Sequence, residues 1–93
     1  MLFTEVSQIK EYIIDFGYDP DIIVFENPDY SEAFIGVSSD GGGRAVYDYE
    51  KMVRCLMEHD GMTEEEAREF IDYNTLGAWF GDKTPIILFP IIE

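Results

Sequence analysis

The sequence predicts a single α+β domain over residues 1–93, in which three helices cover a largely antiparallel sheet of about four strands. Apolar residues recur every three or four positions in three segments, the period of an amphipathic helix. Short apolar runs between Gly-, Pro-, Asn- and Asp-rich turns are typical of strands. The predicted order is α-β-β-β-α-α-β, with helices at 4–16, 49–60 and 64–74 and strands at 22–25, 33–38, 44–47 and 86–89.

The first predicted helix, over 4–16, has an apolar stripe and a signal at each end. Thr4 is a suitable N-cap, and Gly17 suits the position that follows a helix. Pro20 disfavours helical geometry at the residue before it, so the chain leaves the helix there. The stripe comprises Val6, Ile9, Ile13 and Phe16.

Three strands are expected between residues 22 and 48. "IIVF" at 22–25 has the apolar character of a buried strand, and "ENPDYSE" at 26–32 is a loop rich in turn formers. "AFIGVS" (33–38) and "RAVYD" (44–48) flank "SDGGG", so these two segments predict a β-hairpin. The glycines permit the positive φ that such a turn needs.

Two further helices and a last strand complete the chain. Asp48 can cap the helix at 49–60, and Gly61 ends it. Thr63 and Glu66 match the capping box that starts a helix at 64–74. "IILF" at 86–89 reads as the last strand, bounded by prolines. The predicted buried faces comprise Tyr49, Met52, Val53 and Leu56 in one helix and Ala67, Phe70, Ile71 and Asn74 in the next.

Composition excludes several classes of protein. The chain is 46% apolar and 15% aromatic. An acidic disordered tail has far fewer apolar and aromatic residues, so the composition excludes that class. Its net charge of −14 opposes direct contact with nucleic acid or anionic membranes. The N-terminus lacks the pattern of a signal peptide, and the longest apolar run, "PIILFPII", is too short to span a bilayer. With a single cysteine, we expect a cytoplasmic protein.

Candidate catalytic and cofactor motifs are rejected one by one. Cys55 and His59 are spaced i, i+4, but structural zinc needs four ligands and the chain offers one Cys and one His. A buried thiol beside an exposed histidine is the simpler reading. "SDGGGRA" lacks the GK[ST] ending of a phosphate-binding loop. We therefore expect no enzyme, no metal and no cofactor.

Acidic residues are concentrated in one part of the chain. Seven of the 20 carboxylates fall between Glu58 and Asp72. Glu50, Arg54 and Glu58 are spaced to compensate one another along one helix. On the next helix Glu65, Glu69 and Asp72 share an outer stripe, and we expect them to be unpaired. The predicted contact residues are Glu58, Asp60, Glu65, Glu69 and Asp72, with an ordinary solvated helix face as the alternative.

Trp79 and Phe80 provide a second candidate surface. They lie in "WFGDKTP", a stretch without clear periodicity, where the only tryptophan is either a core residue or an exposed anchor for a partner.

Several segments resemble a family of small uncharacterised acidic proteins of Firmicutes and their phages and mobile elements. They are "FENPDYSEAFIGVSSDG", "RAVYDYEKMV", "DGMTEEEAREFIDYNT" and "TPIIL", and the resemblance covers roughly residues 22–89. No activity or site residue comes with it. This chain departs from the family pattern in its longer "DGGGR" turn and in "LGAWF", which stands where a basic residue and a proline are common.

Small size, strong acidity and this resemblance together predict an inhibitor. The hypothesis is an anti-CRISPR-like protein that occupies the positively charged groove of a nucleic-acid-binding defence protein, with carboxylates in place of phosphates. The alternative is a protein–protein interaction module that uses Trp79 and Phe80.

Overall fold

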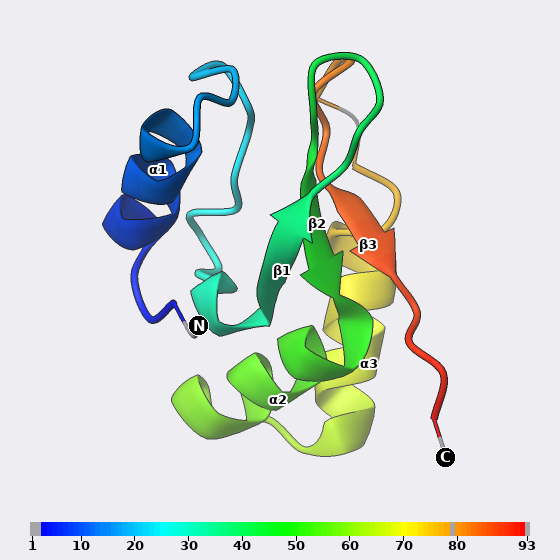
Figure 1. Cartoon of the computed structure of the whole chain (residues 1–93). Coiled ribbons are helices and arrows are strands. Elements are labelled where there is room, and N and C mark those ends of the chain that lie inside the picture. The colour runs from blue at the N-terminus through cyan, green and yellow to red at the C-terminus, as the bar shows by residue number, and fades with distance from the viewer. Residues whose placement is uncertain (1–2, 79, 93) are drawn as a thin grey trace.

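A mixed three-stranded sheet with three helices around it forms the fold (Figure 1). The computed structural model describes residues 3–78 and 80–92. The predicted α+β class is confirmed. Within the described residues the elements are α1 (Val6–Asp15), the 3-10 turn η1 (Ser31–Ala33), β1 (Phe34–Val37), β2 (Ala45–Asp48), α2 (Tyr49–His59), α3 (Glu64–Asn74) and β3 (Ile86–Leu88).

The predicted hairpin is confirmed as the antiparallel pair β1–β2. Phe34 pairs with Tyr47 and Val37 with Ala45, with a bulge between them. The turn is closed by a hydrogen bond of 2.8 Å from the Ser38 N–H to the Arg44 carbonyl. Gly43 has a φ of 103°, and a Cβ there would lie 2.7 Å from a Val37 methyl group. Both its conformation and its surroundings therefore require glycine.

The last strand runs parallel to β2, so the largely antiparallel sheet predicted from the sequence is wrong in this part. Val46 aligns with Ile86 and Asp48 with Leu88, which places β2 between β1 and β3. The chain leaves β2 directly into α2 and returns only after α3. Such a crossover brings the next strand back in the same direction, on the edge of β2 that the hairpin leaves free.

The expected strand at 22–25 is not a strand, and the described chain has three strands rather than four. Ile22 and Val24 are buried as predicted. The Phe25 N–H, however, donates to the hydroxyl of Tyr47 at 3.1 Å and not to a neighbouring strand. Figure 1 shows this segment between α1 and the sheet. Burial alone made it resemble a strand, because a buried extended segment has the same apolar composition.

The predicted helix ends are mostly confirmed. The Asp48 side chain accepts from the Lys51 N–H at 3.1 Å, and Thr63 and Glu66 form the reciprocal capping box of α3. For α1 the N-cap is Glu5 rather than Thr4.

Phe16 follows the last residue of α1 and is 68% exposed, so it lies outside the buried stripe that was predicted to include it. Gly17 follows with a φ of 78°, as expected for a residue that ends a helix.

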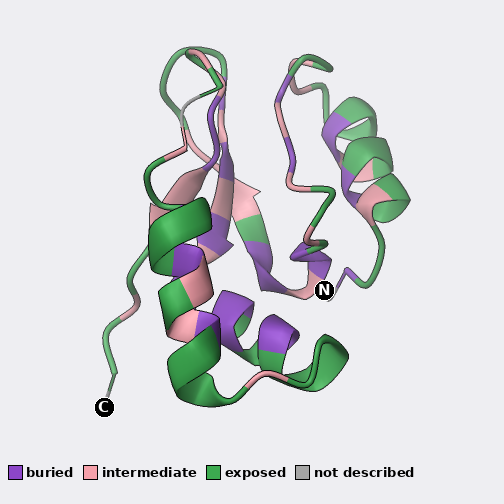
Figure 2. Cartoon of the chain, turned by 180° about the vertical axis from the view of Figure 1, so that it is seen from behind, coloured by how far each residue is buried: buried purple, intermediate pink, exposed green. Residues whose placement is uncertain are grey.

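One continuous hydrophobic core links the sheet, the helices and the 22–30 segment. Figure 2 shows its residues on the inward faces of the ribbon, with outward faces of α1 and α3 exposed. The predicted buried face of α2 is confirmed and also includes Cys55. On α3, Ala67 and Ile71 are buried, whereas Phe70 is half-buried and Asn74 exposed. No helix of the described chain has the length and apolar character needed to cross a bilayer. The largest fully buried side chains are Tyr30, Tyr47, Ile9, Met52, Leu56 and Ile71.

Candidate functional site

The end of α2, the short turn after it and α3 together carry the acidic surface. Gly61, with a φ of 69°, reverses the chain after α2, and the capping box then fixes the start of α3. Carboxylates in the first turn of α3 are stabilised by the helix dipole. We define the acidic surface as Glu58, Asp60, Glu65, Glu69 and Asp72, all of which are exposed.

Arg68, the basic residue of α3, is held between the two helices. Its guanidinium donates to both carboxylate oxygens of Glu50, at 2.9 and 2.8 Å, and to Glu64 at 3.2 Å. It also lies 5.6 Å from the centroid of the Tyr49 ring. The hydrogen bonds from Arg68 lower the pKa of Glu50. This fork-shaped pairing fixes α3 against α2 and leaves Arg68 little freedom to neutralise the outer face.

The predicted compensation within α2 is wrong. Glu50 pairs with Arg68 of the neighbouring helix rather than with Arg54. Among the described residues, Arg54 makes no ion pair with Glu50 or Glu58. Helical spacing predicted a weak exposed pair, but a bidentate contact between two half-buried side chains is more favourable.

Asp72 differs from the other residues of the predicted stripe. Its carboxylate accepts a hydrogen bond of 3.1 Å from the Tyr49 hydroxyl, which the sequence did not predict. The hydroxyl is neutral, and Asp72 makes no ion pair among the described residues, so its charge stays uncompensated as predicted. Glu65 and Glu69 make no ion pair with any described residue. These two glutamates are therefore the centre of the surface that remains available to a partner.

A second cluster of polar side chains lies where α2 meets η1. His59 Nε2 is hydrogen-bonded to the carboxylate of Glu32, and Glu58 lies beside them. The contact with Glu32 raises the pKa of His59. Sequence spacing gave no sign of Glu32, because it precedes His59 by 27 residues within an irregular segment.

Cys55 does not join this cluster as a reactive group. The thiol is buried, as expected, and burial raises its pKa to about 11. A thiol that stays protonated is a poor nucleophile and a poor metal ligand.

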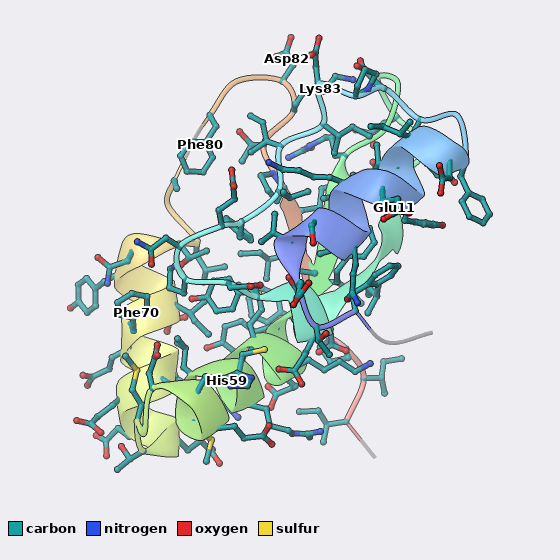
Figure 3. The ribbon with its side chains drawn as sticks, turned by 90° about the vertical axis from the view of Figure 1, so that its left-hand side faces the viewer. Glu11, His59, Phe70, Phe80, Asp82 and Lys83 are labelled. Carbon is teal, nitrogen blue, oxygen red and sulfur yellow. The ribbon has the colours of Figure 1, made fainter. Side chains whose placement is uncertain are left out.

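A cavity of about 540 Å³ opens next to His59. Figure 3 shows His59 on α2 and Phe70 on α3, the two helices that form one side of it. The rest of its lining combines polar residues with the apolar Pro28, Cys55 and Leu56; the polar ones are Thr4, Asn27, Asp29, Ser31, Glu32 and Asp60.

The second predicted surface is described in part. Phe80 is 54% exposed and its N–H donates to Thr84 Oγ1 at 2.6 Å, whereas Trp79 lies outside the described residues. Figure 3 shows Phe80 on the loop that follows α3. It adjoins a groove of about 470 Å³, whose apolar lining includes Phe25, Leu76, Ala78, Ile86 and Ile87.

Comparison with protein-family models, with curated proteins and with solved structures finds no match.

Proposed function

We propose that the protein is a non-enzymatic acidic inhibitor of the phage or mobile-element type. In this proposal it binds the positively charged groove of a nucleic-acid-handling defence protein, such as a CRISPR effector, with carboxylates in place of phosphates. The observation that carries the proposal is the pair Glu65 and Glu69. Both are exposed on α3, while the one arginine of that helix is held by Glu50 and Glu64.

Electrostatics supports this use of α3. A net charge of −14 on 93 residues destabilises the compact state by self-repulsion, and a cationic partner would relieve it. DNA-binding grooves owe much of their affinity to Lys and Arg contacts with phosphate, and a carboxylate competes for the same side chains.

Rigidity supports it as well. The capping box fixes the first turn of α3, and Ala67 and Ile71 are fully buried against the core. The bidentate Arg68–Glu50 pair adds a second anchor. Because the helix does not have to become ordered on binding, less of the interaction free energy is lost to entropy.

The test compares two variants of equal charge. The double variant Glu65→Gln/Glu69→Gln removes two charges from the acidic surface. The control Glu11→Gln/Asp15→Asn removes two exposed charges from α1, which Figure 3 shows on the other side of the molecule from α3. Each protein is added to purified guide-loaded CRISPR effectors, and binding and cleavage of labelled target DNA are measured.

The expected loss follows from the strength of exposed ion pairs. At about 0.5–1 kcal/mol for each pair, two lost pairs weaken inhibition by roughly 5–30-fold at low salt. The α1 control should change inhibition by less than about 2-fold. Raising the salt should weaken the wild type, because exposed charges are screened over about 8–10 Å at physiological ionic strength. The proposal is wrong if the two double variants lose inhibition to the same extent. It is also wrong if the wild-type protein inhibits none of the effectors.

The alternative is an interaction module centred on Phe80. The exposed phenyl ring beside an apolar groove favours it, because aromatic anchors are common at the centres of protein interfaces. Phe80→Ala would then weaken binding more than Glu65→Gln/Glu69→Gln, and salt would have little effect.

A further inference from the structure

We propose that Glu32, Glu58 and His59 form a binding site for a divalent transition-metal ion of the zinc class. Glu32 belongs to η1, and the other two residues end α2. One ligand atom from each side chain lies within 4.8 Å of the other two. Two carboxylates and an imidazole are ligands that zinc takes in proteins. The site goes beyond the proposed inhibitor function and does not depend on it.

The geometry needs only a small adjustment to accept an ion. Ligands at about 2.0–2.2 Å from a tetrahedral zinc lie roughly 3.3–3.6 Å from one another. From separations of up to 4.8 Å, the side chains must move by on the order of 1 Å. Glu58 and His59 are exposed and Glu32 is half-buried, so side-chain rotation can supply this movement without displacing the backbone.

The hydrogen bond between His59 and Glu32 already orients the two ligand atoms, Nε2 of His59 and a carboxylate oxygen of Glu32, toward the same position. Nε2 of the imidazole faces the Glu32 carboxylate across a single proton. A divalent cation that displaces this proton can coordinate both ligand atoms from the position between them. The packing of α2 against η1 holds them together, even though they are far apart in the sequence.

The ligand set selects among ions. Calcium and magnesium prefer oxygen ligands alone, and magnesium retains several waters. An imidazole with two carboxylates suits zinc and its transition-metal neighbours better. The three protein ligands leave a fourth coordination position free for water or another donor. The adjoining cavity provides room for it, since it is lined by Glu32 and His59 as well as by Ser31 and Asp60.

The test titrates chelator-treated protein with Zn²⁺ by calorimetry, with Mg²⁺ and Ca²⁺ in parallel at the same ionic strength. The variants are Glu32→Gln and His59→Gln, each of which removes one ligand. The control is Glu69→Gln, an exposed glutamate of α3 that lies outside the cluster and carries the same charge as Glu32. The wild type should bind one Zn²⁺, and each ligand variant should bind it at least about 10-fold more weakly. Glu69→Gln should leave the affinity within about 2-fold.

Nuclear magnetic resonance gives a second readout. The chain has a single histidine, so the imidazole ¹⁵N signals belong to His59 without further assignment. Zn²⁺ should shift the Nε2 signal strongly, and Mg²⁺ should not. Circular dichroism of each variant checks that the substitutions, at the half-buried Glu32 and the exposed His59 and Glu69, leave the protein folded.

Two results would overturn the proposal. If Mg²⁺ and Ca²⁺ bind as tightly as Zn²⁺, the ions are merely attracted to an acidic protein. If Glu69→Gln weakens Zn²⁺ binding as much as Glu32→Gln, or the His59 signal does not move, the cluster holds no metal and the His59–Glu32 contact is a plain hydrogen bond.

Discussion

Removing the Arg68 side chain should destabilise the fold by loosening α3 from α2. The guanidinium makes two hydrogen bonds to Glu50 and one to Glu64, and it lies over the Tyr49 ring. Hydrogen bonds to charged groups contribute about 1.5–3 kcal/mol when well buried, and exposed ion pairs about 0.2–1 kcal/mol. The Arg68 and Glu50 side chains are 33% and 28% exposed, between these cases. We expect Arg68→Ala to cost about 1–2 kcal/mol.

The measurement is chemical and thermal unfolding followed by circular dichroism. A loss of about 1–2 kcal/mol lowers the Tm of a domain of this size by roughly 4–16 °C. The matched control is Arg54→Ala on α2, because Arg54 is exposed and makes no ion pair with the residues that the structure describes. It should cost less than about 0.5 kcal/mol.

Acid should reduce the difference in stability between wild type and Arg68→Ala, because the part that comes from the charged Glu50 is lost. The pKa of Glu50 is lowered in the folded state from its ordinary 4.5, so the pair contributes its full stability above pH 4.5. That contribution is lost as the pH falls through the lowered pKa, where Glu50 becomes protonated. Equal losses for the Arg68 and Arg54 variants, or a difference that persists unchanged at the lowest pH where the protein is folded, would refute this reasoning.

Three further predictions follow from buried groups. Tyr47→Phe removes the acceptor of the Phe25 N–H and should cost about 1–3 kcal/mol in urea unfolding, whereas Tyr73→Phe, at an 87% exposed position, should cost almost nothing. Native Cys55 should resist alkylation at pH 8, because burial raises its pKa to about 11, and it should react fully in denaturant. Mass spectrometry measures the alkylated fraction, and rapid alkylation of the native protein would contradict the prediction. Gly43→Ala should lower the Tm and disturb the hairpin signals in NMR spectra; an unchanged Tm would mean that the turn can relax around a Cβ.

Local signals in the sequence were enough to predict the helices, the hairpin and the N-caps of α2 and α3, but not the N-cap of α1. The capping box of α3, the cap at Asp48 and the glycine after α1 depend on residues within four positions of one another. The apolar spacing of α2 likewise predicted its buried face. These features follow from backbone geometry that repeats along the chain, so the sequence contains them directly.

Contacts between distant segments were decided only in the tertiary structure. Helical spacing paired Glu50 with Arg54, whereas the packing of α3 on α2 offers Glu50 the bidentate partner Arg68. The 22–25 segment had the composition of a strand, but its Phe25 N–H goes to the Tyr47 hydroxyl.

The candidate sites divide in the same way. Exposure of Glu65 and Glu69 followed from their place on the outer face of a helix, which the sequence by itself determined. The direction of β3 and the meeting of Glu32 with His59 did not follow from any local pattern. Both depend on how the chain crosses from α2 and α3 back to the sheet and on how η1 packs against α2. Spacing along the sequence determines which residues share a face of one element, whereas the packing of elements determines which faces meet.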